Sequence, residues 1–523
     1  MTFTRRLRKG DNVYVYLVTT YRQKGTGKVK QDTEYLGKEI TKDNKTILEP
    51  PKYKRMGVRK VMSYGGPMVL YNLSNEFGLS TIIDKVFEGY TSIENLGKKI
   101  VALAINKILN CDGIENISRW FNLTSLSIHT DLSSDDFTPK KVRTIHSLLS
   151  KETPDFFSMI EHGIVDVIKS KYKENTSILV YDLTPITFYG GVNNLAKFGY
   201  AYKTNGNEKQ INLILAITKE MKLPIHHRIV SGNIVSVSTI KRFIAELKDY
   251  KMKKVVIIID RGFYSKRNLD EFGSKYKVIG ALSSNLNIYK EAVSGSTDID
   301  NSRNYMKYHD EVLFFKEHEI DGKRIIVYHS PKRYNDEIHK FYRDLNELEE
   351  HLKKLEEEKF QSKHEMIEEL KNIFNSYYQY FKYEIKPGWS FKYQLKHKAI
   401  QRRTNRMGKT VLFTTTSFDA KEILKLYREK DVIDKVFEIM KHHGLSPLKT
   451  TTEDSTKAYV NLVIIGYLLL ALLRNKLKDK DLSIEKILHH LDGIKEVLFF
   501  NNSTTIAELT KEQKEIMEDL EML

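Results

Sequence analysis

The sequence contains a single cysteine, Cys111, among 523 residues. One cysteine excludes an internal disulfide framework and any zinc or iron–sulfur site built from several cysteines. Long apolar runs are also scarce: the best candidate, residues 458–473, is interrupted by Asn461 and is shorter than the roughly 18–20 residues of a membrane span, so we expect a buried helix there. The basic opening, MTFTRRLRKGDNVYVYL, lacks the apolar segment of a secretory signal. These absences predict a cytoplasmic protein that does not associate with membranes.

Positive charge, by contrast, is abundant, with 85 Lys and Arg against 68 Asp and Glu and a formal net charge of +17. The length predicts two to four domains, and a hydrophobic content of 41% is enough for packed cores. Residues 1–60 hold 16 Lys and Arg against 6 Asp and Glu, so more than half of the net charge lies in a small part of the chain. This concentration favours DNA as a partner, because each neutralised phosphate releases counterions. A merely solvated basic surface is the alternative.

The first 175 residues divide into a strand pattern followed by a helical pattern. Alternation in VYVYLVTTYR predicts a small β-meander that displays the charge of residues 1–60. In residues 61–175, LGKKIVALAINKIL and GIENISRWFNL place apolar residues three and four apart, as helices do. We therefore expect a helical domain there, and its position after a basic region makes it a candidate for DNA binding.

A mixed sheet is predicted from residue 176 onward. Three β-branched runs, ILVYDLTPITFYGG, INLILAIT and PIHHRIVSG, precede an amphipathic helix and then the apolar strand KVVIIIDRGFYS. Asp182 and Asp260 end the apolar parts of the first and last of these strands. A carboxylate at the end of a buried strand must be paired or bind a cation. If the two strands are neighbours, the acids form a cation site; two strand-end turn caps are the alternative.

A third acid is offered by residues 420–445, which have a helical pattern that stops at Gly444 and Pro447. Tyr427, Lys430, Asp434 and Lys441 recur at intervals of three, four and seven residues and so share one face of the helix. That face could hold a metal with its aspartate and a phosphate backbone with its lysines. An exposed face of ion pairs is the alternative.

These motifs together resemble the insertion-sequence DDE transposases. Asp182 in YDLT, Asp260 in IIIDRGFYS and the stripe at 427–441 look like the Asp, Asp, Glu triad of that family. They are most similar to the insertion-sequence family four superfamily, whose signature is Tyr-(2)-Arg-(3)-Glu-(6)-Lys. Laid on that signature, the Tyr, Arg, Glu and Lys places are taken by Tyr427, Lys430, Asp434 and Lys441. The N-terminal segment VYVYLVTTYRQKGTGKVKQDTEYLGK also resembles the corresponding region of the group.

The resemblance implies an RNase H-like α/β catalytic core, a mixed five-stranded sheet with flanking helices, in which Asp182, Asp260 and Asp434 hold two Mg²⁺ ions, with Mn²⁺ as a substitute. It implies cleavage of DNA at the ends of an insertion sequence, then strand transfer by the freed 3′-hydroxyl. Tyr427, Lys430, Lys441 and Arg261 would contact DNA or its phosphates. Synapsis of two ends implies a homodimer, and the DNA substrate implies a location at the nucleoid.

Two positions depart from the signature. Asp434 is one methylene shorter than the usual Glu, and Glu438, one turn further on, is a rival third ligand. Lys430 lacks the bidentate fork of the usual Arg. Three functions therefore stay open: a transposase, a metal-dependent nuclease without strand transfer, and a decayed DNA-binding remnant.

The 173 residues between Asp260 and Asp434 predict an α+β insertion domain. Two strands, EVLFFKEHEI and KRIIVYHS, are followed by a helix with leucines every three or four residues, which we expect to pair with MIEELKNIFNSYYQYF. The next segment, KPGWSFKYQLKHKAIQRRTNRMGK, mixes cations with aromatic residues. Such a mixture suits stacking on unpaired bases, and its DNA-binding candidates are Trp389, Arg402 and Arg403. Packing of the aromatics into the insertion's own core is the alternative.

The expected organisation has six parts. They are a basic β-rich region (1–60), a helical domain (61–175), the first part of the catalytic core (176–275), the insertion (276–415), the second part of the core with the catalytic helix (416–480) and a C-terminal helical tail (481–523).

Overall fold

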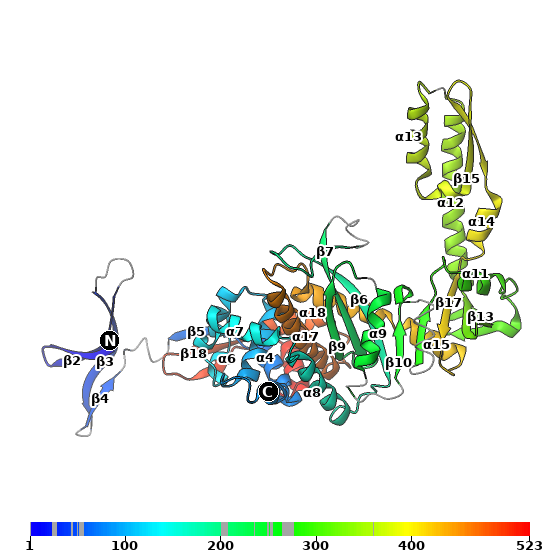
Figure 1. The fold of residues 1–523 in the computed structure, drawn as a ribbon. Helices are drawn as coiled ribbons and strands as arrows, with labels where there is room; N and C mark the ends of the chain where they lie inside the picture. The colour runs from blue at the N-terminus through cyan, green and yellow to red at the C-terminus, as the bar shows by residue number, and fades with distance from the viewer. Residues whose placement is uncertain are drawn as a thin grey trace. The chain divides into compact units, whose positions relative to one another are not determined.

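The computed structural model describes residues 2–22, 29–42, 45–49, 51, 57–199, 208–234, 236–247, 250, 255–263, 277–358 and 360–523. The chain forms two compact units, each built from separate stretches of sequence. Unit 1 comprises Met1–Ile164, Gly190–Val192 and Met440–Leu523, and unit 2 comprises Val165–Tyr189 and Asn193–Ile439. Figure 1 shows the ribbon of both units.

Unit 1 begins with a four-stranded antiparallel sheet in the order β1-β2-β3-β4. Its strands are β1 (Thr2–Lys9), β2 (Asn12–Arg22), β3 (Val29–Lys42) and β4 (Lys45–Glu49). Val15 and Val18 of β2, an inner strand of the sheet, lie on opposite faces and are both buried. Every residue of β1 is exposed. The part of the predicted meander that lies in residues 23–28, including KGTGK, is outside the described residues.

The helical part of unit 1 surrounds two nearly all-buried helices, α4 and α17. Its larger helices are α2 (Gly65–Phe77), α3 (Leu79–Phe87), α4 (Leu96–Leu109), α7 (Pro139–Leu149), α17 (Glu453–Lys476) and α18 (Ile484–Asp492), with α8 (Phe156–Ser170) at the division between the units. The shorter elements are α5 (Ile117–Asn122), α6 (Leu126–His129), the 3-10 turns η1 (Ile114–Asn116) and η2 (Ser134–Phe137), a π-helical turn η6 (Lys441–Leu445) and α19 (Lys511–Asp519). A three-stranded sheet of β5 (Val58–Ser63), β18 (Lys495–Phe499) and β19 (Thr504–Ile506) completes the unit.

Helix α17 is the one described helix that is long and apolar enough to cross a membrane, with a mean hydropathy of 1.8 over its most apolar window. Unit 1 buries 89% of that window, chiefly against α4, α7 and α2. Residues 416–480, expected to form one part of the catalytic core, are divided between the two compact units after Ile439. Helix α17 packs with the helices of unit 1.

Unit 2 is built on a ten-stranded mixed sheet in the order β12-β13-β14-β17-β11-β10-β6-β8-β7, with β9 also paired to β8. Its first strands are β6 (Ile178–Thr187), β7 (Lys197–Phe198), β8 (Lys209–Thr218), β9 (Pro224–Ser231), β10 (Val256–Ile259) and β11 (Lys277–Ala281). The remaining strands are β12 (Tyr305–Tyr308), β13 (Glu311–Ile320), β14 (Lys323–His329) and β17 (Lys409–Thr414). The flanking helices are α9 (Ser236–Glu246), η3 (Arg261–Phe263), α11 (Asn287–Ser294), η4 (Ser302–Asn304), α15 (Ala420–Arg428) and α16 (Asp431–Met440). The predicted mixed sheet with flanking helices is confirmed.

The expected count of five strands is wrong, because strands of the predicted insertion continue the same sheet. β17 pairs antiparallel with β11 on one side and with β14 on the other. Gly280 of β11 lies opposite Phe413, and a Cβ at Gly280 would lie only 2.7 Å from the Phe413 ring, so glycine is what admits this close pairing. The apolar pattern of KTVLFT predicts a strand but does not specify its neighbours.

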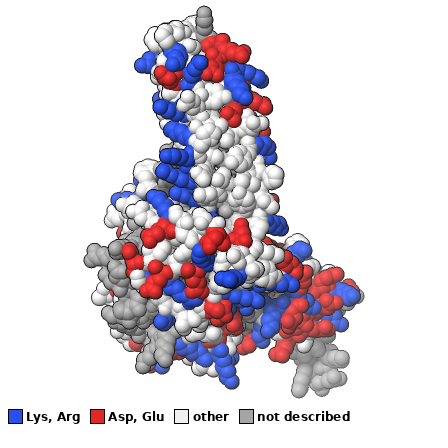
Figure 2. Space-filling view, turned by 90° about the vertical axis from the view of Figure 1, so that its right-hand side faces the viewer, with Lys and Arg blue, Asp and Glu red and all other residues white. Residues whose placement is uncertain are grey.

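The middle of the insertion forms a lobe with its own core. Its elements are α12 (Pro331–Glu356), α13 (Lys363–Phe374), η5 (Asn375–Tyr380), the hairpin β15 (Phe381–Lys386) and β16 (Ser390–Leu395), and α14 (His397–Thr404). Leu345 and Leu352 of α12 pack with Leu370 of α13, as the leucine spacing predicts, and Phe381 and Phe391 of the hairpin join the same cluster. In Figure 2, Lys and Arg side chains form a row along one side of this lobe, beside a surface with few charges.

Candidate active site

The register of two parallel strands brings the first two acids together. β6 and β10 pair from Ile178↔Val256 to Tyr181↔Ile259, so Asp182 and Asp260 are the next residues along both strands. The expectation that Asp182 ends its strand is wrong: β6 continues to Thr187 because β8 pairs with it along its other edge. The pairing with β10, rather than the strand itself, stops before the carboxylate.

The third acid lies on a helix that is broken where a single helix over residues 420–445 was expected. α15 ends at Arg428, α16 starts at Asp431, and the π-helical turn follows α16. At the break, tight bonds connect residues three apart, from Lys430 N–H to Tyr427 C=O and from Ile433 N–H to Lys430 C=O. Neither glycine nor proline lies at this break, so the apolar pattern alone could not locate it.

Lys430, at this break, joins the acids electrostatically. Its Nζ lies 3.5 Å from Asp260 Oδ1 and 3.8 Å from Asp434 Oδ2, and 3.9 Å from the more exposed Asp431. Only 10% of the Lys430 side chain is exposed, against 40% for Asp260 and 60% for Asp434. One largely buried ammonium therefore bridges the carboxylates of the sheet and of the helix.

The electrostatics of Asp182 include all members of this cluster. Burial, the largest cause, and the nearby charges of Asp260 and Asp434 raise the pKa of Asp182, while a hydrogen bond from the Leu183 N–H and the charge of Lys430 lower it; the net result is a pKa of about 7. The ionised form of Asp182 is thus disfavoured in the protein alone. An additional cation between these carboxylates would favour the ionised form.

Tyr427 fixes the second acid from α15. Its hydroxyl donates a hydrogen bond to Asp260 Oδ1 at 3.2 Å. Burial raises the pKa of Tyr427 above its ordinary value, and the charge of Asp260 adds to the rise, so the hydroxyl stays protonated as a donor. Arg261, the exposed residue after Asp260, also interacts with the Tyr427 side chain.

The donor set of the cluster suits a hard divalent cation. Carboxylate oxygens are the ligands that Mg²⁺ and similar ions take in proteins. Among the described residues, no group of three or more His, Cys, Asp or Glu side chains is already drawn together closely enough to surround an ion. The ammonium of Lys430 occupies the space between two of the carboxylates and offsets part of their mutual repulsion.

Comparison with known protein families decides the class of this protein. The model of the transposase DDE domain matches residues 173–469, more than half of the chain. The chain belongs to the DDE transposase family. It is a DNA transposase, as the sequence analysis predicted, and membership of this family implies the use of a divalent metal ion.

Comparisons with solved structures and with curated proteins do not refine this assignment. Among solved structures, the piggyBac transposase in a synaptic complex with hairpin DNA is similar over 82% of this chain and 79% of its own, at 11% sequence identity and a TM-score of 0.39. No curated protein matches the sequence.

The other predicted DNA-binding residues of this transposase are Trp389, Arg402 and Arg403 in the insertion and Lys441 after α16. Trp389 occupies the turn between β15 and β16, has a positive φ of 54° and is 43% exposed. Phe391, two residues later, is 1% exposed and packs in the core of the lobe. Arg402 and Arg403 are exposed on α14. Lys441 belongs to unit 1 and not to the unit that contains the acids.

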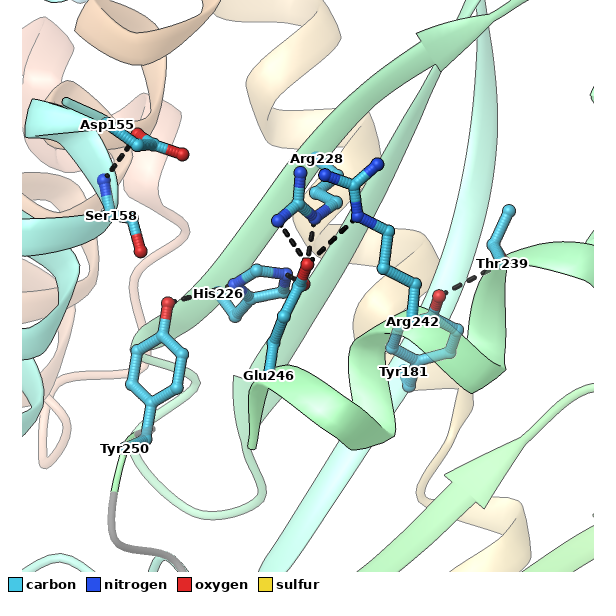
Figure 3. A network of polar contacts seen from close by, with 9 residues as sticks. All are labelled: Asp155, Ser158, Tyr181, His226, Arg228, Thr239, Arg242, Glu246 and Tyr250. Carbon is cyan, nitrogen blue, oxygen red and sulfur yellow. Dashed lines mark hydrogen bonds and ion pairs between the residues drawn. The ribbon is translucent and has the colours of Figure 1, made fainter. Parts of the chain in front are cut away.

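Sequence reasoning missed a buried polar network that attaches α9 to the sheet (Figure 3). Glu246 of α9 forms a bidentate ion pair with Arg228 of β9, and its Oε2 lies 3.1 Å from His226 Nε2. Burial opposes ionisation of Glu246, but hydrogen bonds from His226 and Arg228 outweigh it and lower the pKa of Glu246 to about 2. The only signal in the sequence is the pair of histidines in PIHHRIVSG, and it does not indicate which residue they contact.

The helix held by this network packs on the strand that carries Asp182. α9 stacks Phe243 on the ring of Tyr181 at 4.3 Å, and the Tyr181 hydroxyl donates to Thr239. Because successive side chains of a strand point to opposite faces, Tyr181 faces α9 while Asp182 faces α15 and α16. The contacts of Tyr181 with α9 therefore hold the part of β6 from which Asp182 projects.

Proposed function

We propose that Asp182, Asp260 and Asp434 are the DDE triad of this transposase, with aspartate in the place of the usual glutamate. The observation that carries the proposal is the shared ammonium of Lys430, which lies within 3.8 Å of both Asp260 and Asp434 while the charges of both acids act on Asp182. Strands β9, β8, β6, β10 and β11 are adjacent in this order; β8 runs in one direction and the other four run in the opposite direction. This arrangement supports an RNase H-like core within the larger sheet.

The three carboxylates would hold two Mg²⁺ ions, or Mn²⁺ in their place. Bound there, the ions would supply Lewis acidity at the scissile phosphodiester. The chain's own groups do the positioning: Tyr427 holds the Asp260 carboxylate through its hydrogen bond, and Lys430 neutralises charge between two of the acids. Arg261, exposed beside the cluster, is placed to contact a phosphate.

The reaction on this site would proceed in two displacements. Water attacks a phosphodiester at the end of the element, and the bond to the 3′-oxygen breaks to leave a 3′-hydroxyl. That hydroxyl then attacks a phosphodiester of the target DNA, so that one phosphodiester forms as another breaks. The contribution of the protein is to align these groups and to offset their charge.

We assign the chain to the insertion-sequence family four superfamily on the spacing of Tyr427, Lys430, Asp434 and Lys441. Two of these residues support the assignment by their contacts: Tyr427 and Lys430 both reach Asp260. Lys441 would contact the DNA backbone from the turn that follows α16. Lys430 replaces the bidentate fork of an arginine with a point charge.

Other parts of the chain would hold the DNA. We keep the six predicted segments as the proposed organisation of the chain: the basic β region, the helical DNA-binding domain, the two parts of the core, the insertion and the C-terminal tail. Within the insertion, Trp389 would stack on an unpaired base while Arg402 and Arg403 contact phosphates; the exposed ring and the positive φ of Trp389 support this role. A homodimer would bring two ends together, and the protein would act at the nucleoid in the cytoplasm.

The experiment is incubation of the purified protein with duplex DNA carrying the ends of the element and Mg²⁺. We expect nicks that leave a 3′-hydroxyl, followed by joined products. Asp182→Ala and Asp260→Ala should retain binding to the ends and lose both products. Nicks without joining would indicate a nuclease, and cleavage that survives both substitutions would refute the triad.

A further inference from the structure

The two faces of the N-terminal sheet carry different charges. Residues that pair across antiparallel strands share a face, so the register assigns each side chain. One face, here called the Arg5 face, contains Phe3, Arg5, Leu7 and Lys9 of β1, Tyr14, Tyr16 and Val18 of β2, Tyr35 and Lys38 of β3, and Ile47 and Glu49 of β4. The opposite face, the Arg6 face, contains Arg6 and Arg8 of β1, Val13 and Val15 of β2, and Asp32, Glu34 and Glu39 of β3.

Charge is segregated between these faces. Among the described side chains, the Arg5 face has three cations and one acid, Glu49, which lies directly opposite Lys38. Neither Arg5 nor Lys9 has an ion-pair partner within the part of the chain that the structure describes. The Arg6 face instead has three acids for two cations, and Arg6 pairs with Glu39 at 2.7 Å.

Apolar side chains of the Arg5 face are exposed in the part of the chain that the structure describes. Phe3, Leu7 and Ile47 are 40%, 45% and 43% exposed, although a sheet is normally stabilised by burying one face against another layer. A second copy of the same face would place Arg5 and Lys9 against like charges. A polyanion instead matches the charge that this face presents.

The tyrosines of the face indicate how a nucleic acid would contact it. Tyr35 packs against Tyr16 at 5.1 Å and Tyr14 at 6.0 Å, and all three are half-buried, so their rings are engaged with one another and not presented for stacking on bases. The cations lie around them. Arg5 and Lys9 are four residues apart, about 13 Å along β1, and Lys38 is two strands away, about 10 Å across the sheet. These spacings are close to the ~12 Å width of the DNA major groove.

We propose that the Arg5 face docks on the phosphate backbone of duplex DNA and anchors the transposase to it independently of sequence. This interaction goes beyond the proposed active site: it requires that the chain acts on DNA but not that the three acids are correctly assigned. Arg5 and Lys9 supply the phosphate contacts, and Phe3, Leu7 and the tyrosines form the surface between them.

The test measures binding of the full chain to a labelled duplex by fluorescence anisotropy, in EDTA so that no strand is cut, at salt concentrations from 50 to 200 mM. The variant R5Q/K9Q removes two charges from the Arg5 face. The matched control R6Q/R8Q removes two charges from the same strand on the opposite face. A single strand of equal length and a sedimentation measurement complete the set.

Plotted against log salt, the logarithm of the association constant has a negative slope. Loss of two phosphate contacts in R5Q/K9Q should reduce the magnitude of this slope by about 1.8. The ratio of the parental association constant to that of R5Q/K9Q should therefore fall roughly twelvefold between 50 and 200 mM salt. R6Q/R8Q should show less than half of this effect. Equal loss in both variants, loss for the single strand alone, or unchanged binding with a changed oligomeric state would overturn the proposal. Failure of end cleavage in Asp182→Ala would leave this result untouched, so the two proposals fail separately.

Discussion

Replacing Asp182 with asparagine should stabilise this transposase at alkaline pH in the absence of divalent ions. Burial holds the pKa of Asp182 at about 7, above its ordinary value of 3.8. Well below pH 3.8 the carboxyl is protonated in both the folded and the unfolded chain, so its raised pKa does not change the stability. As the pH rises towards 7 the unfolded chain ionises first, so the stability of the folded state declines, and the decline is complete above pH 7.

The size of this effect follows from the shift. One pKa unit corresponds to about 1.4 kcal/mol, so a rise of about three units sets an upper limit of about 4 kcal/mol at pH 8. Asparagine keeps an oxygen to accept the hydrogen bond from the Leu183 N–H and carries no charge. Each kcal/mol moves the melting temperature of a unit of this size by about 2–4 °C, so Asp182→Asn should melt several degrees higher than the parent.

The assay is thermal melting in EDTA at pH 8 and at pH 4.5, repeated at pH 8 with Mg²⁺. The gain should be largest at pH 8, small at pH 4.5, and reduced by Mg²⁺, which should raise the melting temperature of the parent more than that of the variant. The control is Asp431→Asn, which removes an exposed carboxylate 3.9 Å from the same lysine and should show no such gain. A variant that melts at or below the parent temperature at both pH values would refute the reasoning.

Three further outcomes are expected. Lys430→Gln removes the ammonium between two carboxylates and should enlarge the rise in melting temperature with Mg²⁺ while lowering cleavage; an unchanged Mg²⁺ response would contradict this. Tyr427→Phe loses a hydrogen bond to Asp260 worth about 1.5 kcal/mol and should slow end cleavage roughly tenfold without unfolding the protein; a parental rate would count against it. Trp389→Ala should leave the melting temperature unchanged and weaken binding to DNA with unpaired bases, whereas Phe391→Ala should destabilise the lobe by about 3–5 kcal/mol; the converse pattern would exclude a stacking role.

Sequence reasoning reached the parts of this fold that depend on local pattern. The apolar runs of β6, β8, β9 and β10 were visible as strands, and two of them carried the acids that the register brings together. The leucine spacing of α12 likewise predicted the core of the lobe. In each case the hydrophobic pattern that predicts the element and the residues used in the argument lie in the same short stretch of chain.

What the sequence could not provide was the choice of distant partners. β17 completes the sheet by pairing with β11 and β14, a choice that rests on the close fit of Gly280 and Phe413. The helix breaks at Lys430, although the apolar pattern of the sequence continues through this residue without a change. The ion pair of Glu246 with Arg228 joins a helix to a strand, and neither residue signals the other in the sequence.

The central claim, that the third carboxylate of the active site is Asp434, is tested most directly by comparing two neutral variants one helical turn apart. End cleavage with Mg²⁺ is measured for Asp434→Asn and Glu438→Gln, both on α16, with binding to the same DNA measured alongside. We predict that Asp434→Asn binds but makes no 3′-hydroxyl and that Glu438→Gln cleaves as the parent does. Cleavage by Asp434→Asn together with its loss in Glu438→Gln would contradict the assignment.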